Sequence, residues 1–523
     1  MGDPAAIVLC TLNAKYIHAS LGLRYLLANM DRHGGAGLRA RTVLREYTIA
    51  REAQVIVYEL LALQPAIVGF GVYIWNVTQT TEVARRLKHL APDIKIVLGG
   101  PEVSHEVEQQ AITRLADHVI TGWGDVSFPR LCRALLDGPP PLMKVIPGEQ
   151  PPLDQIALPY AEYSHDDLAH RLLYVEASRG CPFKCEFCLS SLDKTAWAFD
   201  LDAFLAAMDV LYRRGARHFK FVDRTFNLKV EGSLRILQFF LDRLSADLFV
   251  HFEVIPDHLP ERLQEMIRRF PPGVLQFEVG IQTFNVQVQQ RISRKQDNAK
   301  SEANLRWLIE ESPAHLHVDL IFGLPGETLE SFAAGFDRLH ALGPHEIQLG
   351  LLKRLRGTPI ARHTAEHGMV YDPAPPYTVQ QTGAVDAATV QRYARLARYW
   401  ELVANSGRFA RTLALLLQGP SAFAAFLAFS DWLWQGHGET AHLTPEQLVD
   451  ALHDYLLHVR HLEPGTVQAA LVADYVASGA RARPASLREL LPAQGAPVPR
   501  SARQRAERQA RHVDALPAGQ ALR

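Results

Sequence analysis

Cysteine is scarce in this chain, which has only 5 among 523 residues. A framework of disulfide bonds is therefore not expected, because secreted proteins that depend on disulfides are rich in cysteine and pair it evenly. An excess of charge of either sign is also lacking, with 55 basic and 56 acidic side chains. This balance removes the overall electrostatic argument for a nucleic-acid or membrane-surface partner and leaves open only a local basic groove.

Long hydrophobic runs are missing as well. No apolar stretch approaches the roughly 20 residues that span a bilayer. The apolar run at residues 5–9 has no basic flank and is too short for the core of a signal peptide. We therefore expect a cytoplasmic protein with no membrane partner, and a length of 523 residues suggests about three domains.

Residues 1–138 alternate short β-branched runs with helical patterns. Strands are predicted at residues 7–12, 42–47, 67–73, 94–98 and 118–120, and helices at residues 20–30, 53–63, 82–90 and 128–136. Apolar strands between helices indicate a doubly wound, Rossmann-like parallel sheet of the α/β class. Glycines follow three of these strands, where a flat ligand could approach the backbone. Glycines that only make tight turns are the alternative.

Four further segments follow. Residues 139–168 are rich in proline and are interpreted as a stiff linker. Residues 169–383 carry six strand–helix repeats, which predict a partial TIM-like (βα)6 barrel with its site at the carboxyl ends of the strands. Its strands are expected at residues 173–177, 218–222, 249–254, 275–280, 317–322 and 346–351. Residues 384–479 are predicted to be helical, and residues 480–523, with nine arginines and three acids, to be a disordered tail.

Three of the five cysteines, Cys181, Cys185 and Cys188, lie within eight residues, just after the first barrel strand. Three thiolates so spaced can hold three corners of a cubane iron–sulfur cluster and leave the fourth iron open. A zinc site would need a fourth protein ligand, and His170 lies eleven residues upstream, beyond the strand. The cluster is therefore favoured over zinc, and Cys10 and Cys132 are expected in the core.

The CxxxCxxC motif, with Phe187 before its last cysteine, resembles that of the radical SAM superfamily. The resemblance implies a 4Fe–4S cluster whose open iron chelates S-adenosylmethionine. Reduction then cleaves this molecule to methionine and a 5′-deoxyadenosyl radical, which abstracts hydrogen. A reductant of the flavodoxin or ferredoxin type is implied too.

Other barrel segments resemble this family in the same order, including Gly280-Ile-Gln-Thr and the Gly-Leu-Pro-Gly-Glu-Thr turn that begins at Gly323. Arg224 departs from the acid pair that is commoner in the family. Alone, each segment could be a helix cap or an ordinary turn. By resemblance, the residues that contact S-adenosylmethionine are Phe187, Asp223, Glu253, Gln282, Gly323 and Gly326.

The N-terminal domain resembles that of the cobalamin (B12)-dependent subclass of radical SAM proteins. Trp123 and Asp125 stand where this subclass usually has two acids. The Asp-x-His-x-x-Gly motif that supplies an axial histidine is absent, since His18 lies one residue too far from Gly22. Cobalamin is thus expected to bind without a protein imidazole on cobalt. The residues assigned to it by resemblance are Trp75, Asn76, Gly99, Gly100, Gly122 and Gly124.

Residues 395–409 resemble the helical accessory region of an uncharacterised branch of this subclass. The resemblance implies a cobalamin-dependent radical SAM methyltransferase that acts on an unactivated carbon of an unknown substrate. Two other enzymatic hypotheses are a cobalamin-dependent rearrangement or cyclisation, and an RNA-modifying methylthiotransferase. Methylthiotransferases carry three extra cysteines in their N-terminal domain, and this chain lacks them. Nucleic acid is therefore not indicated as a partner. A corrinoid carrier or sensor is the non-enzymatic alternative.

Overall fold

The computed structural model describes residues 6–193, 195–480 and 483–491. Most of the expected tail therefore lies outside the described residues. The chain divides into two compact units. The first comprises Met1–Glu253, Lys353–Arg362 and Tyr371–Thr378, and the second comprises Val254–Leu352, His363–Val370 and Val379–Arg523. No helix in the described ranges has the length and apolarity to cross a membrane.

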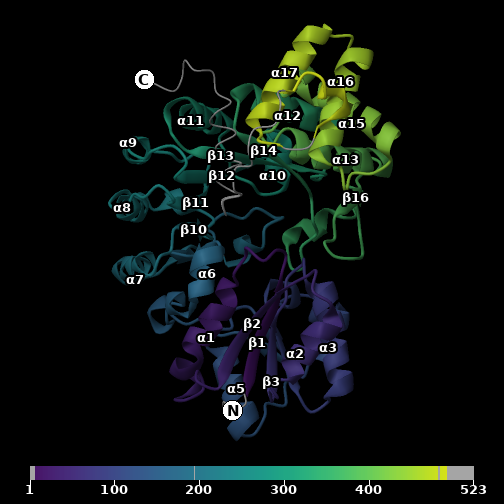
Figure 1. Cartoon of the computed structure of the whole chain (residues 1–523). Helices are drawn as coiled ribbons and strands as arrows, with labels where there is room; N and C mark the ends of the chain where they lie inside the picture. The colour runs from purple at the N-terminus through teal and green to yellow at the C-terminus, as the bar shows by residue number, and fades with distance from the viewer. Residues whose placement is uncertain (1–5, 194, 481–482, 492–523) are drawn as a thin grey trace. The chain divides into compact units, whose positions relative to one another are not determined.

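The first unit opens with a doubly wound parallel sheet, as predicted. Its strands follow the order β2-β1-β3-β4-β5-β6, and in Figure 1 α1 lies on one side of them with α2 and α3 on the other. The strands are β1(Ile7–Asn13), β2(Thr42–Thr48), β3(Ile67–Gly71), β4(Lys95–Gly99), β5(His118–Thr121) and β6(Val145–Pro147). The helices are α1(Leu21–Gly34), α2(Ala53–Leu61), α3(Val77–Leu90), α4(Ala111–Leu115) and α5(Ser127–Asp137).

The central strand β1 shows why this sequence forms a covered sheet. All seven of its residues are buried. Val8, Cys10 and Leu12 pack into one hydrophobic core, and the alternate residues Ile7 and Leu9 pack into another. Because successive strand side chains point to opposite faces, a strand with helices on both faces must be apolar at every position. The buried positions of Cys10 and Cys132 confirm that both are core residues.

The proline-rich segment is packed rather than extended. It contributes β6, a 3-10 turn at Tyr160–Glu162 and α6(His165–His170), and it buries Leu153, Ile156 and Tyr160. The sequence pattern did not predict β6, which lies at the edge of the sheet. An edge strand tolerates proline because half of its backbone groups need no partner.

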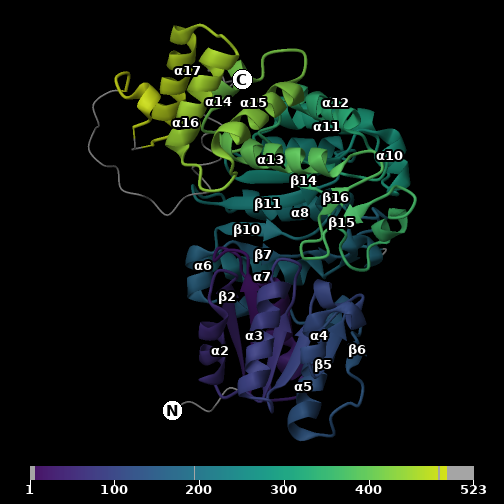
Figure 2. The same ribbon diagram turned by 90° about the vertical axis from the view of Figure 1, so that its right-hand side faces the viewer.

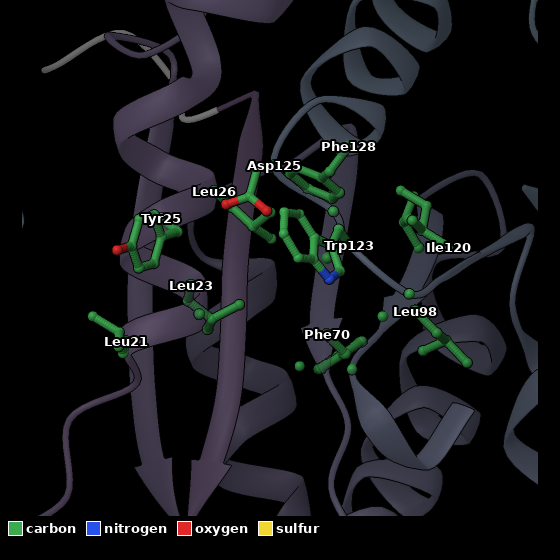
Figure 3. A pocket seen from close by; sticks show the side chains of 18 of the residues that line it. Leu21, Leu23, Tyr25, Leu26, Phe70, Leu98, Ile120, Trp123, Asp125 and Phe128 are labelled. Atoms are coloured by element: carbon green, nitrogen blue, oxygen red, sulfur yellow. The ribbon is translucent and has the colours of Figure 1, made fainter. Parts of the chain in front are cut away.

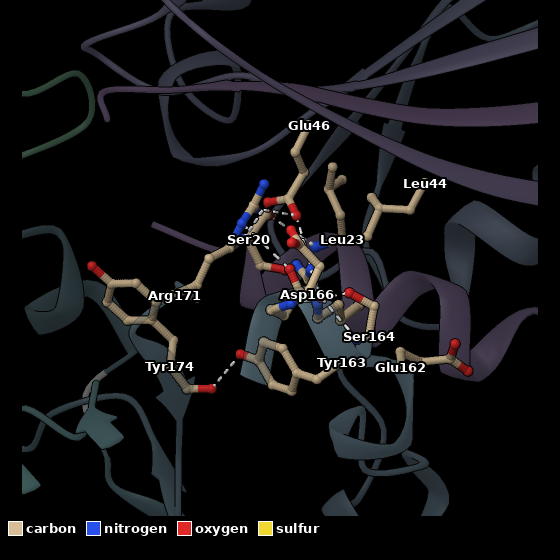
Figure 4. A network of polar contacts seen from close by, with 12 residues as sticks. Ser20, Leu23, Leu44, Glu46, Glu162, Tyr163, Ser164, Asp166, Arg171 and Tyr174 are labelled. Carbon is tan, nitrogen blue, oxygen red and sulfur yellow. Dashed lines mark hydrogen bonds and ion pairs between the residues drawn. The ribbon is translucent and has the colours of Figure 1, made fainter. Parts of the chain in front are cut away.

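A buried network of ion pairs joins α1 and β2 to this segment (Figure 4). The guanidinium of Arg24 lies 2.8 Å from carboxylate oxygens of both Glu46 and Asp167. Arg171 adds bonds of 2.9 Å to Glu46 and 3.4 Å to Asp167. Arg24 also lies over the ring of Tyr163, whose hydroxyl donates to the carbonyl of residue 174. Two cations and two carboxylates thus balance in a site closed to water.

The barrel strands alternate with helices as predicted and pair in parallel. In the first unit, β10(His218–Phe221) pairs with β7(Leu173–Val175) and with β11(Phe249–Val254). In the second unit, β13(His315–Phe322) pairs with β12(Leu275–Gln282) and with β14(Glu346–Leu351). The helices are α7(Leu201–Arg213), α8(Val230–Leu241), α9(Glu261–Arg268), α10(Val286–Arg291), α11(Asn298–Glu311) and α12(Leu329–Leu342).

The C-terminal part of the second unit is helical, as expected. Its helices are α13(Ala387–Val403), α14(Ala410–Leu416), α15(Ala422–His437), α16(Pro445–Asp454) and α17(Pro464–Ala477), of which α17 was not predicted. Helix α13 lies beside β14 (Figure 2). The buried indole of Trp400 donates to the carbonyl of Ile347 at 3.0 Å, so Trp400 is a packing residue.

Candidate functional site

The three-cysteine loop follows β7 and the short strand β8(Ser178–Arg179). Gly180 has a φ of +83°, and a Cβ there would meet the carbonyl of Thr195 at 2.2 Å, so only glycine suits this turn. The N–H of Cys188 donates to the carbonyl of Cys185 at 3.1 Å. Burial raises the pKa of the Cys181 thiol to about 11, and the nearby thiols of Cys188 and Cys185 add to the rise. The fold thus gathers three soft sulfur donors, which suit an iron–sulfur cluster.

A later segment, residues 353–362, which we call the strap, contacts this loop within the first unit. The N–H of Ile360 donates to the carbonyl of Glu186 at 3.0 Å, and Arg362 pairs with the buried Glu186 carboxylate. The strap also contacts the N-terminal sheet, because Arg356 pairs with Glu102 at 3.0 Å and with Glu106 at 2.8 Å. No pattern in the sequence predicts these contacts.

The carboxyl ends of β10 and β11 carry two of the expected site residues. Asp223 is buried and accepts from the N–H of Ala177 at 3.0 Å and from the hydroxyl of Ser178 at 2.6 Å. Burial raises the pKa of Asp223 to about 7. Arg224 lies 2.7 Å from both carboxylate oxygens of Glu253. Arg224, which departs from the family pattern, therefore neutralises the charge of Glu253, one of the acids expected to contact S-adenosylmethionine.

The second unit holds the remaining expected contacts to S-adenosylmethionine. Gln282 ends β12 with a φ of +67°, and its buried Oε1 has no hydrogen-bond partner among the residues that the structure describes. Gly323 and Gly326 have φ values of +86° and +71°, which glycine adopts without strain. A Cβ on Gly323 would also meet Val379 at 2.5 Å. Both glycines are thus explained by the backbone of the turn.

A cavity of about 300 Å³ opens at the carboxyl ends of the strands of the N-terminal sheet (Figure 3). Leu23 and Leu26 of α1 face Trp123 and Phe128 across it. Four of the residues assigned to cobalamin line the cavity, namely Gly99, Gly100, Gly122 and Gly124. A mostly apolar concave site with a few polar groups is typical of cofactor binding.

The glycines of the cavity serve different purposes. A Cβ on Gly99 would have only one neighbour, at 3.8 Å, and a Cβ on Gly122 would have none within 4 Å. These two positions keep space open. By contrast, a Cβ on Gly69 would meet the ring of Phe128 at 2.7 Å, and one on Gly100 would meet the carbonyl of Val72 at 2.5 Å. These glycines are explained by packing of the protein itself.

Trp75 and Asn76 do not line the cavity. Trp75 is half exposed and stacks on Tyr73, with ring centroids 4.4 Å apart. The amide of Asn76 is buried and donates to the carbonyls of Leu12 and Gly71 at 3.0 and 3.1 Å. Asn76 therefore ties the ends of β1 and β3 together, a structural role that the sequence could not distinguish from ligand binding.

Arg179 is the site residue that sequence analysis missed. It lies two positions before Cys181 and lines the polar end of the cavity. Its guanidinium bonds to Asp125 at 2.8 Å and to Glu176 at 2.7 Å, and it lies 4.9 Å from the ring centre of Trp123. Trp123 and Asp125, which both depart from the family pattern, thus contact the same residue. Their joint departure was the signal in the sequence that could have indicated the role of Arg179.

His18, considered above as an axial ligand, is occupied elsewhere. One of its ring nitrogens, Nδ1, lies 2.8 Å from the hydroxyl of Tyr174, and its backbone pairs with Leu172. These contacts join the turn before α1 to β7.

Comparison with known families finds three matching segments of the chain. Residues 7–132 match the B12 binding domain, and residues 175–339 match the Radical SAM superfamily. The chain contains a radical SAM domain and a B12-binding domain. These domains identify its cofactors as a 4Fe–4S cluster with S-adenosylmethionine, and cobalamin. Residues 365–520 match a protein family of unknown function, DUF4080, in agreement with the accessory region expected there.

Curated relatives and a solved structure are also similar to this chain. The radical SAM protein is 29% identical over 207 residues to "Uncharacterized methyltransferase PH0819" of Pyrococcus horikoshii, covering 34% of this chain and 44% of the relative. It is 23% identical to "Cobalamin-dependent radical SAM methyltransferase TokK" of Streptomyces tokunonensis, covering 55% of this chain and 47% of the relative. The chain thus spans just under half the length of these relatives. The fold is similar to that of the cobalamin-dependent S-adenosylmethionine radical enzyme OxsB with aqua-cobalamin bound, with a TM-score of 0.59 and 14% identity over 90% of this chain and 79% of that chain.

Proposed function

We propose that this protein is a methyltransferase that acts on an unactivated carbon. The observation that carries the proposal is that a glycine-lined cavity and a three-cysteine loop share Arg179 within one compact unit. When bound, the cluster with S-adenosylmethionine supplies radical chemistry, and cobalamin supplies methyl transfer. The protein contributes binding, orientation and exclusion of water.

Each residue in the proposed sites has a defined task. Cys181, Cys185 and Cys188 bind the cluster through their thiolates. Gly99 and Gly122 leave space for part of a corrinoid, and Gly100 and Gly124 line the same cavity. His18 would not bind the cobalt, because its ring contacts Tyr174. The proposed contacts to S-adenosylmethionine are Phe187, Asp223 and Glu253 in the first unit, and Gln282, Gly323 and Gly326 in the second.

Anaerobic reconstitution with iron, sulfide and hydroxocobalamin tests the function. Under strong reduction, we expect S-adenosylmethionine to give 5′-deoxyadenosine, and to give S-adenosylhomocysteine only when cobalamin is present. The second product separates methyl transfer from a rearrangement, which does not transfer the methyl group. A carrier or sensor would release neither product, and that result would overturn the proposal.

Substitution of Gly99 by leucine tests the proposed cobalamin cavity. The new side chain should fill open space and weaken cobalamin binding by about 100-fold, because a corrinoid and an isobutyl group cannot share the volume. Equilibrium dialysis against hydroxocobalamin measures this loss. The control is Gly232→Leu in α8, where a Cβ would meet nothing within 4 Å. Equal affinity in the two variants would place the corrinoid elsewhere.

We also propose that an external reductant of the flavodoxin or ferredoxin type serves the cluster. Thiolate ligands need a compartment that keeps cysteine reduced, which supports a cytoplasmic location.

A further inference from the structure

Outside the sites described above, two histidines and a glutamate come together in the second unit. His315 and His317 belong to β13, and Glu346 begins β14. The Nε2 atoms of His315 and His317 lie 3.1 and 2.9 Å from different oxygens of the Glu346 carboxylate. One ligand atom from each of the three residues lies within 4.8 Å of the other two.

The sheet itself produces this arrangement. His315 and His317 are two positions apart, so their side chains share one face of β13. Glu346 stands directly opposite His317 in the parallel register and therefore points to the same face. The intervening residue, Leu316, belongs to the other face, which carries Val318, Leu320 and Phe322. Phe322 stacks on Tyr393 of α13, so the apolar face is the one that helices cover.

We propose that His315, His317 and Glu346 bind one zinc ion. Two imidazole nitrogens and a carboxylate, with a water molecule as fourth ligand, form a common zinc donor set. Zinc bonds of about 2.0–2.2 Å place neighbouring ligand atoms roughly 3.3 Å apart, close to the distances of 2.9 and 3.1 Å found here. A ligand atom of one imidazole also lies within 4.8 Å of a ligand atom of the other.

The surroundings favour binding of a cation. His315 and Glu346 are each 3% exposed and His317 is 21% exposed, so the carboxylate charge is held away from water while one ligand still reaches solvent. Glu278 of β12 stands opposite His317 in register and adds a second acidic residue to this face. The three ligands lie on paired strands, which hold their spacing more firmly than a loop would.

The site lies where the accessory helices attach. Ile347, next to Glu346, donates its N–H to the side chain of Asn405 at 3.1 Å and accepts from the indole of Trp400 at 3.0 Å. A zinc ion across β13 and β14 would therefore stabilise the strand on which α13 packs.

A second group of possible ligands, His363, Glu366 and His367, is less suitable. Its glutamate side chain is 77% exposed, and all three residues come from one short turn. This group provides a matched control, because it offers the same donor types without a rigid sheet.

The test measures zinc in a background that lacks the three cysteines of the loop. The parent is the full chain with Cys181, Cys185 and Cys188 replaced by alanine, purified in the presence of zinc and then dialysed. We expect about one zinc per chain by elemental analysis. Adding His317→Ala should reduce this to less than a tenth, whereas adding His367→Ala should leave it unchanged.

A second measurement covers the case in which the His317 variant does not fold. The zinc-free parent is titrated with Co²⁺, whose visible absorption reports tetrahedral nitrogen and oxygen ligands. Saturation at about one equivalent, lost in Glu346→Gln, supports the site. A parent without zinc and without a cobalt spectrum would overturn it and leave Glu346 as a hydrogen-bond acceptor for two histidines. Zinc that is lost with His367 instead of His317 would overturn it too.

Discussion

Replacing Cys185 by alanine is expected to reduce 5′-deoxyadenosine formation to the level of a reaction without protein. The loop would keep two thiolates, whereas the cluster needs three from the protein. Cys185 is only half buried, so the loss of its sulfur should leave little cavity in the fold. The iron content of reconstituted protein should fall from about four per chain to less than one.

The control for this variant is Cys132→Ala. Cys132 is completely buried in α5 and lies in the core of the N-terminal sheet. Its replacement should lower stability modestly and leave iron content and 5′-deoxyadenosine formation close to those of the natural protein. Full 5′-deoxyadenosine formation by the Cys185 variant would show that the cluster has other ligands. Loss of iron in the Cys132 variant would show that iron content reports folding instead of ligation.

Replacing Arg24 by methionine is expected to destabilise the first unit by about 3–5 kcal/mol, because it leaves two buried carboxylates with only one cation between them. Arg24 is 2% exposed, and Glu46 and Asp167 are 6% and 7% exposed, so water cannot replace the lost guanidinium. Arg171 alone would then face both acids. Urea unfolding followed by circular dichroism measures the change as a shift of the unfolding transition.

The matched comparison is Arg85→Met on α3. Arg85 also forms a close ion pair, at 2.8 Å from Glu82, but both side chains are exposed. Water and salt screen such a pair, so its loss should not shift the transition measurably. Equal shifts in the two variants would mean that burial does not determine the strength of the Arg24 network.

Patterns along the chain predicted the parts of the fold that depend on local physics. The apolar run of β1 is visible because a central strand must be buried on both faces. The cysteine loop is visible because its donors lie within eight residues. The proline-rich segment was interpreted as a linker because composition shows where proline stands, but not that Tyr160 and Leu153 find a core to enter.

Contacts between distant residues could not be predicted in the same way. Arg356 and Glu102 are 254 positions apart, and Arg24 and Asp167 are 143 apart. Pairs of this kind depend on which strands become neighbours, and no periodicity in one sequence shows that. The zinc site illustrates a smaller error. The fifth barrel strand was predicted to begin at His317, two residues late, so that His315 was left outside the strand that aligns the two histidines.

The strap also sets an order of assembly while the chain is being made. Arg362 is 176 positions beyond Glu186, the residue that it holds in the cysteine loop. At about 5–20 residues per second, a ribosome adds this length in roughly 10–35 s. During that time the loop is present without the strap. Stable insertion of iron into the loop would therefore follow synthesis of the last barrel strand, even though all three cysteines emerge early.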